Sequence, residues 1–183
     1  MNVRHGTLDG VLLIEPQVFE DHRGQYLETF NERGYREAGV SAHFVQDDIS
    51  VSGKNVLRGL HGDDETWKLI SCLHGRIYFV VANCDESSPG FGAWEAHVIS
   101  DTNRLQVLVP PRYANGHLVL SDSAIFHYKQ SSYYPTQQFT LRWDDPRFDI
   151  WWPIDRPILS QRDQGPGPRS QAPAGRSRTG EGR

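Results

Sequence analysis

Cysteine is scarce in this chain, which has 2 cysteines and a single methionine in 183 residues. Cys72 and Cys84 both fall in apolar segments, so we expect small buried side chains and neither a disulfide framework nor a CxxC motif. No apolar run is long enough to span a membrane, and the N-terminus has no charged-then-apolar signal pattern. These absences favour a cytoplasmic protein with no membrane partner.

Positive charge is also scarce outside the C-terminus. The formal net charge is −4, and residues 165–183 carry four arginines and one glutamate. Because this tail contributes +3, residues 1–164 carry −7, which argues against nucleic acid or an anionic membrane surface as the main partner. A phosphate-bearing ligand would need a local basic pocket in such a body.

Short apolar segments separated by turn residues dominate residues 1–164. Their even spacing predicts an all-β fold, an antiparallel sandwich or barrel such as a jelly roll, with one or two short helices. The one clear helical segment is 31–38, NERGYREA, with Gly39 as its stop. Residues 153–163 are expected to run back over the barrel. The predicted strands are 11–14, 26–30, 43–49, 56–61, 67–73, 76–83, 94–99, 105–109, 118–120, 124–130 and 139–143.

The chain divides into one domain, 1–164, and a tail. Residues 165–183 are rich in Gly, Pro, Ser and Arg, and alanine is their only apolar residue. Such a segment cannot bury enough apolar surface to fold, so we expect a disordered tail.

A basic, polar set interrupts two predicted strands. It consists of Arg58 and His61 in VLRGLH and Lys68 in TWKLI. Burying such groups is costly unless they are paired or wetted, so these strands are expected to line a pocket. Strict alternation puts Arg58 and His61 on opposite faces, unless Gly59 forms a bulge that re-aims one of them.

Two further polar side chains share a face with apolar neighbours. Lys68 shares a face with Ile70 and Cys72, and Tyr128 shares a face with Phe126 and Gln130. Lys68 could stabilise an oxyanion or extend from a strand edge to solvent, and Tyr128 could be a general acid or an amphipathic core residue.

His61 is the best candidate for a base, because an imidazole accepts a proton near neutral pH. Asp163 could orient it, or could be a surface carboxylate. Arg23, in a turn, could meet a phosphate or solvent. A metal site is an alternative. Metal-binding cupins have a His-x-His motif, which is missing here because Gly62-Asp63 follow His61. Glu65 and His117 could still join His61 in a set of two histidines and one carboxylate that binds iron.

Ten motifs in this order resemble the nucleotide-sugar 3,5-epimerase family, whose best-known member is dTDP-4-dehydrorhamnose 3,5-epimerase. The resemblance covers residues 5–164 and is specific for the family, not for the substrate. The motifs are VFEDHRG (18–24), LETFN (27–31), FVQD (44–47), VLRGLH (56–61), KL (68–69), SPGFG (88–92), LVLS (118–121), YK (128–129), RWDDP (142–146) and ILSQRD (158–163).

The resemblance implies a jelly-roll cupin that acts without a metal or other cofactor, usually as a homodimer. The implied substrate is a nucleoside-diphosphate 4-keto-6-deoxy sugar, inverted at C3 and C5 or at C3 only through an enolate. By position, His61 is the base and Asp163 its dyad partner. Lys68 steadies the enolate oxygen and Tyr128 returns the proton.

The resemblance also assigns substrate-binding positions. Arg23 and Arg58 would hold the diphosphate, since guanidinium geometry matches phosphate oxygens. The remaining positions are Glu28 and Gln46, which would contact the substrate or the base, and Tyr134, which would stack.

The sequence departs from the family pattern at three places. Gly62-Asp63 replace Tyr-Gln, Asp48-Ile49 replace Asn-His, and Asn115 stands where the family has His. His117, two residues further along the same face, could take over that function. These departures resemble a subgroup that acts on GDP-linked 4-keto-6-deoxy-heptoses. A metal-dependent cupin oxidoreductase and a non-catalytic sugar-nucleotide binder remain the alternative functions.

Overall fold

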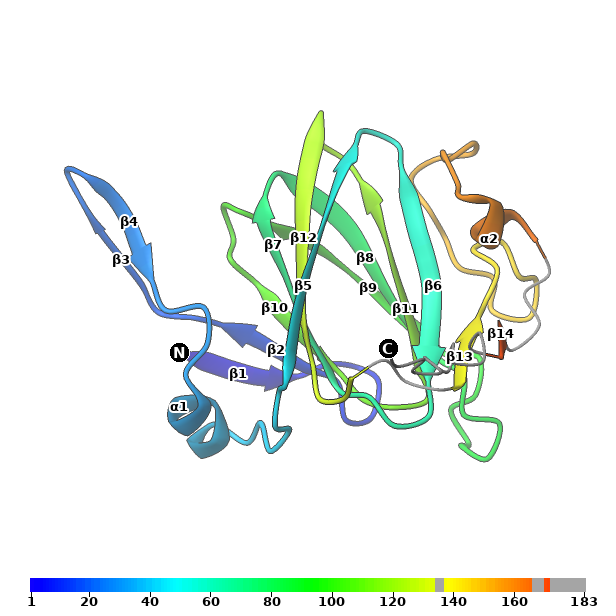
Figure 1. Ribbon diagram of the computed structural model, residues 1–183, viewed down its shortest axis with the longest axis horizontal. Coiled ribbons are helices and arrows are strands. Elements are labelled where there is room, and N and C mark those ends of the chain that lie inside the picture. Colours follow the sequence, from blue (N-terminus) through cyan, green and yellow to red (C-terminus); the bar gives the residue numbers. More distant parts are fainter. Residues whose placement is uncertain (134–136, 166–169, 172–183) are drawn as a thin grey trace, which may run out of the picture.

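The fold is an all-β jelly roll built from two six-stranded antiparallel sheets that face each other (Figure 1). The computed structural model describes residues 1–133, 137–165 and 170–171. Neighbouring strands are often distant in sequence, so non-local pairing closes the barrel. In order across the first sheet, the strands are β1 (Asn2–His5), β2 (Leu12–Glu15), β10 (Gln106–Val109), β7 (Lys68–His74), β12 (Ser123–Gln130) and β5 (Gln46–Gly53).

The second sheet faces the first and carries the C-terminal segment on its outer side (Figure 1). A separate hairpin and two short helices complete the described chain. The second sheet is β14 (Ser170–Gln171), β13 (Gln137–Thr140), β6 (Leu57–Asp63), β11 (Tyr113–Val119), β8 (Arg76–Asn83) and β9 (Trp94–Ser100); the hairpin is β3 (Val18–Asp21) and β4 (Gly24–Leu27), and the helices are α1 (Glu32–Glu37) and α2 (Gln161–Gln164).

The main core lies between the two sheets. Ile70 of β7 and Phe126 of β12 meet Ile77 and Phe79 of β8 there, and all four are buried. Alternation along the strands places these apolar side chains on the inner faces. Their burial is what brings the polar side chains of the same faces into the interior.

Two smaller clusters cover the outer faces. Trp152 and the 154–159 segment pack on the back of the second sheet, where Val56 pairs with Ile158 in a parallel bridge. The predicted return of residues 153–163 over the barrel is therefore confirmed. On the other side, Tyr35 of α1 packs against Leu69 and Leu108 of the first sheet.

The predicted helix at 31–38 is confirmed. Asn31 is the N-cap of α1, and its side chain accepts a hydrogen bond from the Gly34 N–H at 3.1 Å. Gly39 follows the helix with φ of +96°, a left-handed conformation that glycine adopts without strain.

Most predicted strands are confirmed with shifted ends, and two expectations are corrected. The 26–30 segment is not a core strand, because only its start belongs to β4, in a hairpin of exposed residues. The 118–120 segment is the end of a longer strand, β11, whose Asn115-Gly116 centre hides its pattern. Strands β1 and β3 and the helix α2 were not predicted, since each is short and mostly exposed.

The expected disordered tail lies mostly outside the described residues. Of residues 165–183, the structure describes Gly165 and the two residues of β14, which pair with β13. Cys72 and Cys84 are free, and Cys72 is buried as expected. Among the described helices, none is long and apolar enough to cross a membrane.

A buried carboxylate ties the N-terminal loop to the edge of the second sheet. Glu95 of β9 accepts hydrogen bonds from the Thr7 hydroxyl, from the Thr7 and Leu8 N–H groups and from His97. Burial alone would raise its pKa, but these four donors lower the pKa of Glu95 to about 2. The carboxylate therefore stabilises the fold in its ionised form.

Glu95→Gln should destabilise the protein at neutral pH, because the amide cannot replace the charge that the four donors stabilise. A folded pKa of about 2 against 4.5 corresponds to about 3 kcal/mol, present above pH 4.5 and lost as the pH falls toward 2. Denaturant unfolding of both proteins from pH 7 to 2 measures this difference, which should shrink on acidification. Glu15→Gln, at an exposed 3.9 Å ion pair with Arg4, is the matched control and should change stability by less than about 1 kcal/mol. A constant difference across this pH range would contradict the prediction.

Candidate active site

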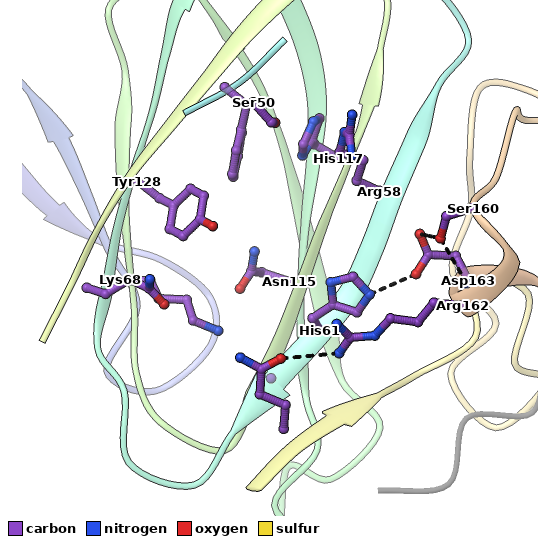
Figure 2. A pocket seen from close by; sticks show the side chains of 14 residues that line it. Ser50, Arg58, His61, Lys68, Asn115, His117, Tyr128, Ser160, Arg162 and Asp163 are labelled. Carbon is purple, nitrogen blue, oxygen red and sulfur yellow. Dashed lines mark hydrogen bonds and ion pairs between the residues drawn. The ribbon is translucent and has the colours of Figure 1, made fainter. Parts of the chain in front are cut away.

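A cavity of about 390 Å³ opens between the two sheets. Side chains from both sheets and from α2 converge on it (Figure 2). Its volume is in the range of small-molecule sites, and its lining is unusually polar for the interior of a β-barrel. It is lined by Ser50, Arg58, His61, Gly62, Lys68, Asn115, His117, Phe126, Tyr128, Gln130, Gln138, Ser160, Arg162 and Asp163.

His61 and Asp163 form a hydrogen-bonded pair on one wall. His61 Nε2 lies 2.7 Å from Asp163 Oδ1, although the residues are 102 positions apart in sequence. The imidazole is 32% exposed and the carboxylate 3% exposed, so the histidine faces the cavity and the aspartate lies behind it. If Nε2 carries the proton toward Asp163, Nδ1 is left as the acceptor.

Helix α2 holds Asp163 in place. Ser160 is the N-cap of α2. Its hydroxyl donates a hydrogen bond to Asp163 Oδ2 at 2.9 Å and accepts one from the Asp163 N–H at 3.2 Å. Burial would raise the Asp163 pKa, but the hydrogen bonds from His61 and Ser160 outweigh it and hold the pKa below its usual value. The pair is therefore an imidazole oriented by a stable carboxylate.

Arg58 and His61 line the same cavity, whereas strict alternation along β6 would place their side chains on opposite faces. The pairing of β6 with β11 shifts register between Asn115 and His117, so a bulge brings both side chains to one side. Gly59 allows this, with φ of +118° and an ideal Cβ position only 2.6 Å from Gly116 Cα. The predicted bulge at Gly59 is confirmed.

Tyr128 and Lys68 come from the opposite sheet, on β12 and β7, as their predicted inward faces require. Burial raises the pKa of Tyr128, and Asp48 adds to this, so the phenol stays protonated at neutral pH. Burial lowers the pKa of Lys68, while Asp63, 3.4 Å from its Nζ, raises it again.

Asn115 and His117 both line the cavity, as their two-residue spacing predicted. His117 is 3% exposed and stacks on Phe126 with ring centroids 4.1 Å apart. Burial, then Arg58 and His61, lower the pKa of His117 to about 3, so this imidazole is neutral. Within the described part of the chain, Ser50 Oγ, Asn115 Oδ1 and His117 Nε2 have no hydrogen-bond partner. A polar ligand could satisfy these atoms.

Three predicted binding residues lie outside the cavity. Arg23 sits in the exposed β3–β4 hairpin and bonds Asp21 at 2.6 Å, and Glu28 lies near the base of that hairpin. Gln46 bonds Asp48 at 2.7 Å and does not line the cavity. Tyr134 falls outside the described residues.

Several lining residues were not predicted. Gln130 lies on the same inward strand face as Tyr128, so strand alternation could have predicted it. Arg162 directly precedes Asp163, so the ILSQRD motif could have predicted it. Arg162 bonds Thr140 at 3.2 Å and Gln138 at 3.4 Å, which fixes its side chain beside the cavity. No local signal marks Ser50, which tertiary packing alone brings to this wall.

The alternative iron-binding set is not assembled. Glu65 is exposed, whereas His117 is buried against Phe126. Among residues 1–133, 137–165 and 170–171, no three His, Cys, Asp or Glu side chains are grouped as a metal ion would require.

Comparison with known proteins identifies the family of this chain. The dTDP-4-dehydrorhamnose 3,5-epimerase family model matches residues 5–168. The dTDP-4-dehydrorhamnose 3,5-epimerase of Escherichia coli (strain K12) is 41% identical over 170 residues, which cover 90% of this chain and 92% of that protein.

Solved structures give the same result. The dTDP-6-deoxy-D-glucose-3,5-epimerase of Legionella pneumophila, in complex with dTDP-4-keto-L-rhamnose, superposes with a TM-score of 0.84 at 37% identity, over 88% of this chain and 89% of that one. A 3'-monoepimerase from Streptomyces bikiniensis, in complex with dTDP-quinovose, has a TM-score of 0.80 at 30% identity, over 86% and 82%.

These three relatives are described as dTDP-sugar enzymes, so the expected subgroup acting on GDP-linked heptoses is not supported. The match to the family model spans most of the chain, and the identities and coverage are high over the same region. The chain therefore belongs to the dTDP-4-dehydrorhamnose 3,5-epimerase family and is an isomerase.

Proposed function

We propose that this protein epimerises a dTDP-linked 4-keto-6-deoxy sugar without a cofactor, by moving protons through an enolate. The observation that carries the proposal is the His61–Asp163 pair on one wall of the cavity with Tyr128 on the opposite sheet. A base and an acid on opposite walls can remove a proton from one face of a carbon and return one to the other.

The proposed first step is proton abstraction. The ketone at C4 makes the hydrogens at C3 and C5 acidic, and His61 Nδ1 takes one of them. The electron pair moves onto the C4 oxygen, where the Lys68 ammonium stabilises the enolate charge. Asp163 holds the imidazole and stabilises the imidazolium that forms.

The proposed second step is protonation from the opposite face. Tyr128, kept protonated by burial, gives its phenolic proton to the carbon and becomes a phenolate, while the electron pair of the enolate forms the new C–H bond and the C4 ketone is restored. Exchange with water then removes the proton from His61 and restores it to Tyr128. Each inverted carbon therefore acquires one hydrogen from solvent.

The basic side chains of the cavity suit the diphosphate. Arg58 is exposed at the cavity wall, with its Nε bonded to Ser52 at 2.8 Å, and Arg162 lines the same cavity. Guanidinium groups pair with phosphate oxygens in a bidentate way, which supports this binding site in an acidic protein.

The first experiment follows solvent hydrogen into the sugar. Incubation with dTDP- and GDP-linked 4-keto-6-deoxy sugars in D₂O, with NMR and mass spectrometry, should give deuterium with the dTDP substrate. Deuterium at C3 and C5 would identify a 3,5-epimerase, and deuterium at C3 alone a monoepimerase. Faster exchange with the GDP sugar would contradict the proposed nucleotide, and no exchange with either would overturn the proposed chemistry.

His61→Asn should slow deuterium uptake by about 10²–10⁴-fold, because the amide cannot accept the proton. Substrate binding, measured by calorimetry, should change little. His43→Asn, at an exposed histidine 3.2 Å from Glu32, is the matched control and should keep full activity. An unchanged rate in His61→Asn would mean that another group is the base.

Tyr128→Phe should separate exchange from inversion. His61 can still remove a proton and return solvent deuterium to the same face, but the acid for the opposite face is missing. We therefore expect deuterium uptake with little inverted product, measured by NMR coupling constants. Tyr78→Phe, at a tyrosine bonded to the Trp151 carbonyl, is the control. Unimpaired inversion in Tyr128→Phe would exclude Tyr128 as the acid.

We also propose a homodimer, which would explain why Arg23 lies away from its own cavity. Among the described strands, β3 and β4 pair only with each other, and they project from the body (Figure 1). Phe19 is 54% and Tyr26 69% exposed on this hairpin. A two-stranded hairpin is only marginally stable alone, so packing on a second copy would stabilise it. In that arrangement Arg23 can serve the partner's diphosphate site.

Mixing two inactive variants tests this arrangement. If Arg23 acts in the partner's site, Arg23→Ala and His61→Asn should complement each other when co-expressed with different tags. Half of randomly mixed dimers are hybrids with one intact site, so about a quarter of wild-type activity should return. Lack of recovery in a purified hybrid dimer would show that Arg23 does not act across subunits, and a monomer in sedimentation would contradict the dimer.

A further inference from the structure

A buried ion pair joins Lys68 of the cavity wall to Asp63, which has no role in the proton transfers described above. Asp63 ends β6 and Lys68 begins β7, so the pair joins the two facing sheets across the 64–67 loop. Asp63 Oδ2 is 3.4 Å from Lys68 Nζ, and the two side chains are 2% and 11% exposed. Lys68 faces the cavity, whereas Asp63 does not line it.

The two oxygens of Asp63 have different surroundings. Oδ1 accepts hydrogen bonds from the Thr66 N–H at 2.7 Å and the Glu65 N–H at 3.1 Å, which close the turn after β6. Oδ2 has no hydrogen-bond partner in the described part of the chain and is the oxygen that faces Lys68. A buried carboxylate oxygen without a neutral donor is stabilised chiefly by the ammonium beside it.

Asp163 lines the same cavity but is paired with His61, so Asp63 is the carboxylate that lies against Lys68. Arg162 of α2 approaches from the second sheet's side and its positive charge disfavours the ammonium. His61 on β6 and the protonated Tyr128 on β12 line the same cavity. Burial and Arg162 both lower the pKa of Lys68, and Asp63 opposes them.

We propose that Asp63 is a positioning residue that holds Lys68 as an ammonium ion directed into the cavity. This inference rests on the proposed function, in which the ammonium of Lys68 stabilises the enolate oxygen. Asp63 touches no reacting atom and acts through Lys68.

Asp63→Asn tests the charge while keeping the turn. The amide oxygen can still accept from the Glu65 and Thr66 N–H groups, while the oxygen that faces Lys68 is replaced by an uncharged NH2 group. Because an opposite charge at this distance shifts a pKa by about 1–3 units, the alkaline limb of the kcat–pH profile should move down by about that amount. Asp101→Asn is the matched control, since Asp101 accepts the Gly75 N–H at 2.7 Å in a turn away from the cavity. An alkaline limb that stays in place would overturn the proposal.

A double-mutant cycle separates positioning from a structural role. If Asp63 acts through Lys68, Asp63→Asn should lower kcat in the wild-type background and change it little in a Lys68→Met background. Full multiplication of the two effects would mean that Asp63 supports the site by some other route, and would overturn the proposal.

A third measurement does not depend on the reaction. NMR titration of ¹³Cε-labelled lysine, with the Lys68 signal assigned by Lys68→Met, should show a lower Lys68 pKa in Asp63→Asn than in the wild type. An unchanged Lys68 titration would overturn the inference. If the Lys68 pKa is lower in Asp63→Asn but the wild type exchanges no deuterium, then Asp63 does hold Lys68 as an ammonium ion. The proposed epimerase chemistry would be wrong in that case.

Discussion

The close approach of β6 and β11 at Gly59 is the constraint on which the candidate active site depends. A Cβ on Gly59 would lie 2.6 Å from Gly116 Cα, and one on Gly116 would lie 2.9 Å from the Arg58 carbonyl oxygen. Two glycines therefore let the strands meet where their register shifts. Without that shift, β6 would direct Arg58 and His61 to opposite faces, and the cavity would lose either its histidine or its arginine.

Two buried carboxylates then organise the groups that β6 and β7 bring to the cavity. Asp163, in the segment that covers the outer side of the second sheet, lies 2.7 Å from His61. Asp63 lies 3.4 Å from Lys68. Each carboxylate is almost fully buried and sits behind the side chain that faces the cavity. Pairing a buried charge in this way offsets its desolvation and fixes the orientation of its partner.

The hairpin of β3 and β4 has a different physical status from the barrel. The barrel buries its inner faces between two sheets, while the hairpin exposes aromatic side chains and Arg23 to solvent. A site that depends on both parts would couple substrate binding to association of two copies. This coupling would explain why the two arginines expected to hold the diphosphate are separated, with Arg58 in the cavity and Arg23 on the projecting hairpin.

The sequence by itself determined the all-β class, most of the strands, the α1 helix and the inward faces of Lys68 and Tyr128. These features follow from alternation, turn residues and capping, which act over a few neighbouring positions. It also placed a possible bulge at Gly59 and, through resemblance to a family, paired His61 with Asp163. Only the tertiary structure decided which of the predicted binding residues share one cavity, since Arg58 lies inside it and Glu28 and Gln46 lie outside. It also decided the Asp63–Lys68 pair, because the conformation of the turn at 64–67 and the packing of β6 against β7 set whether two residues five positions apart face each other.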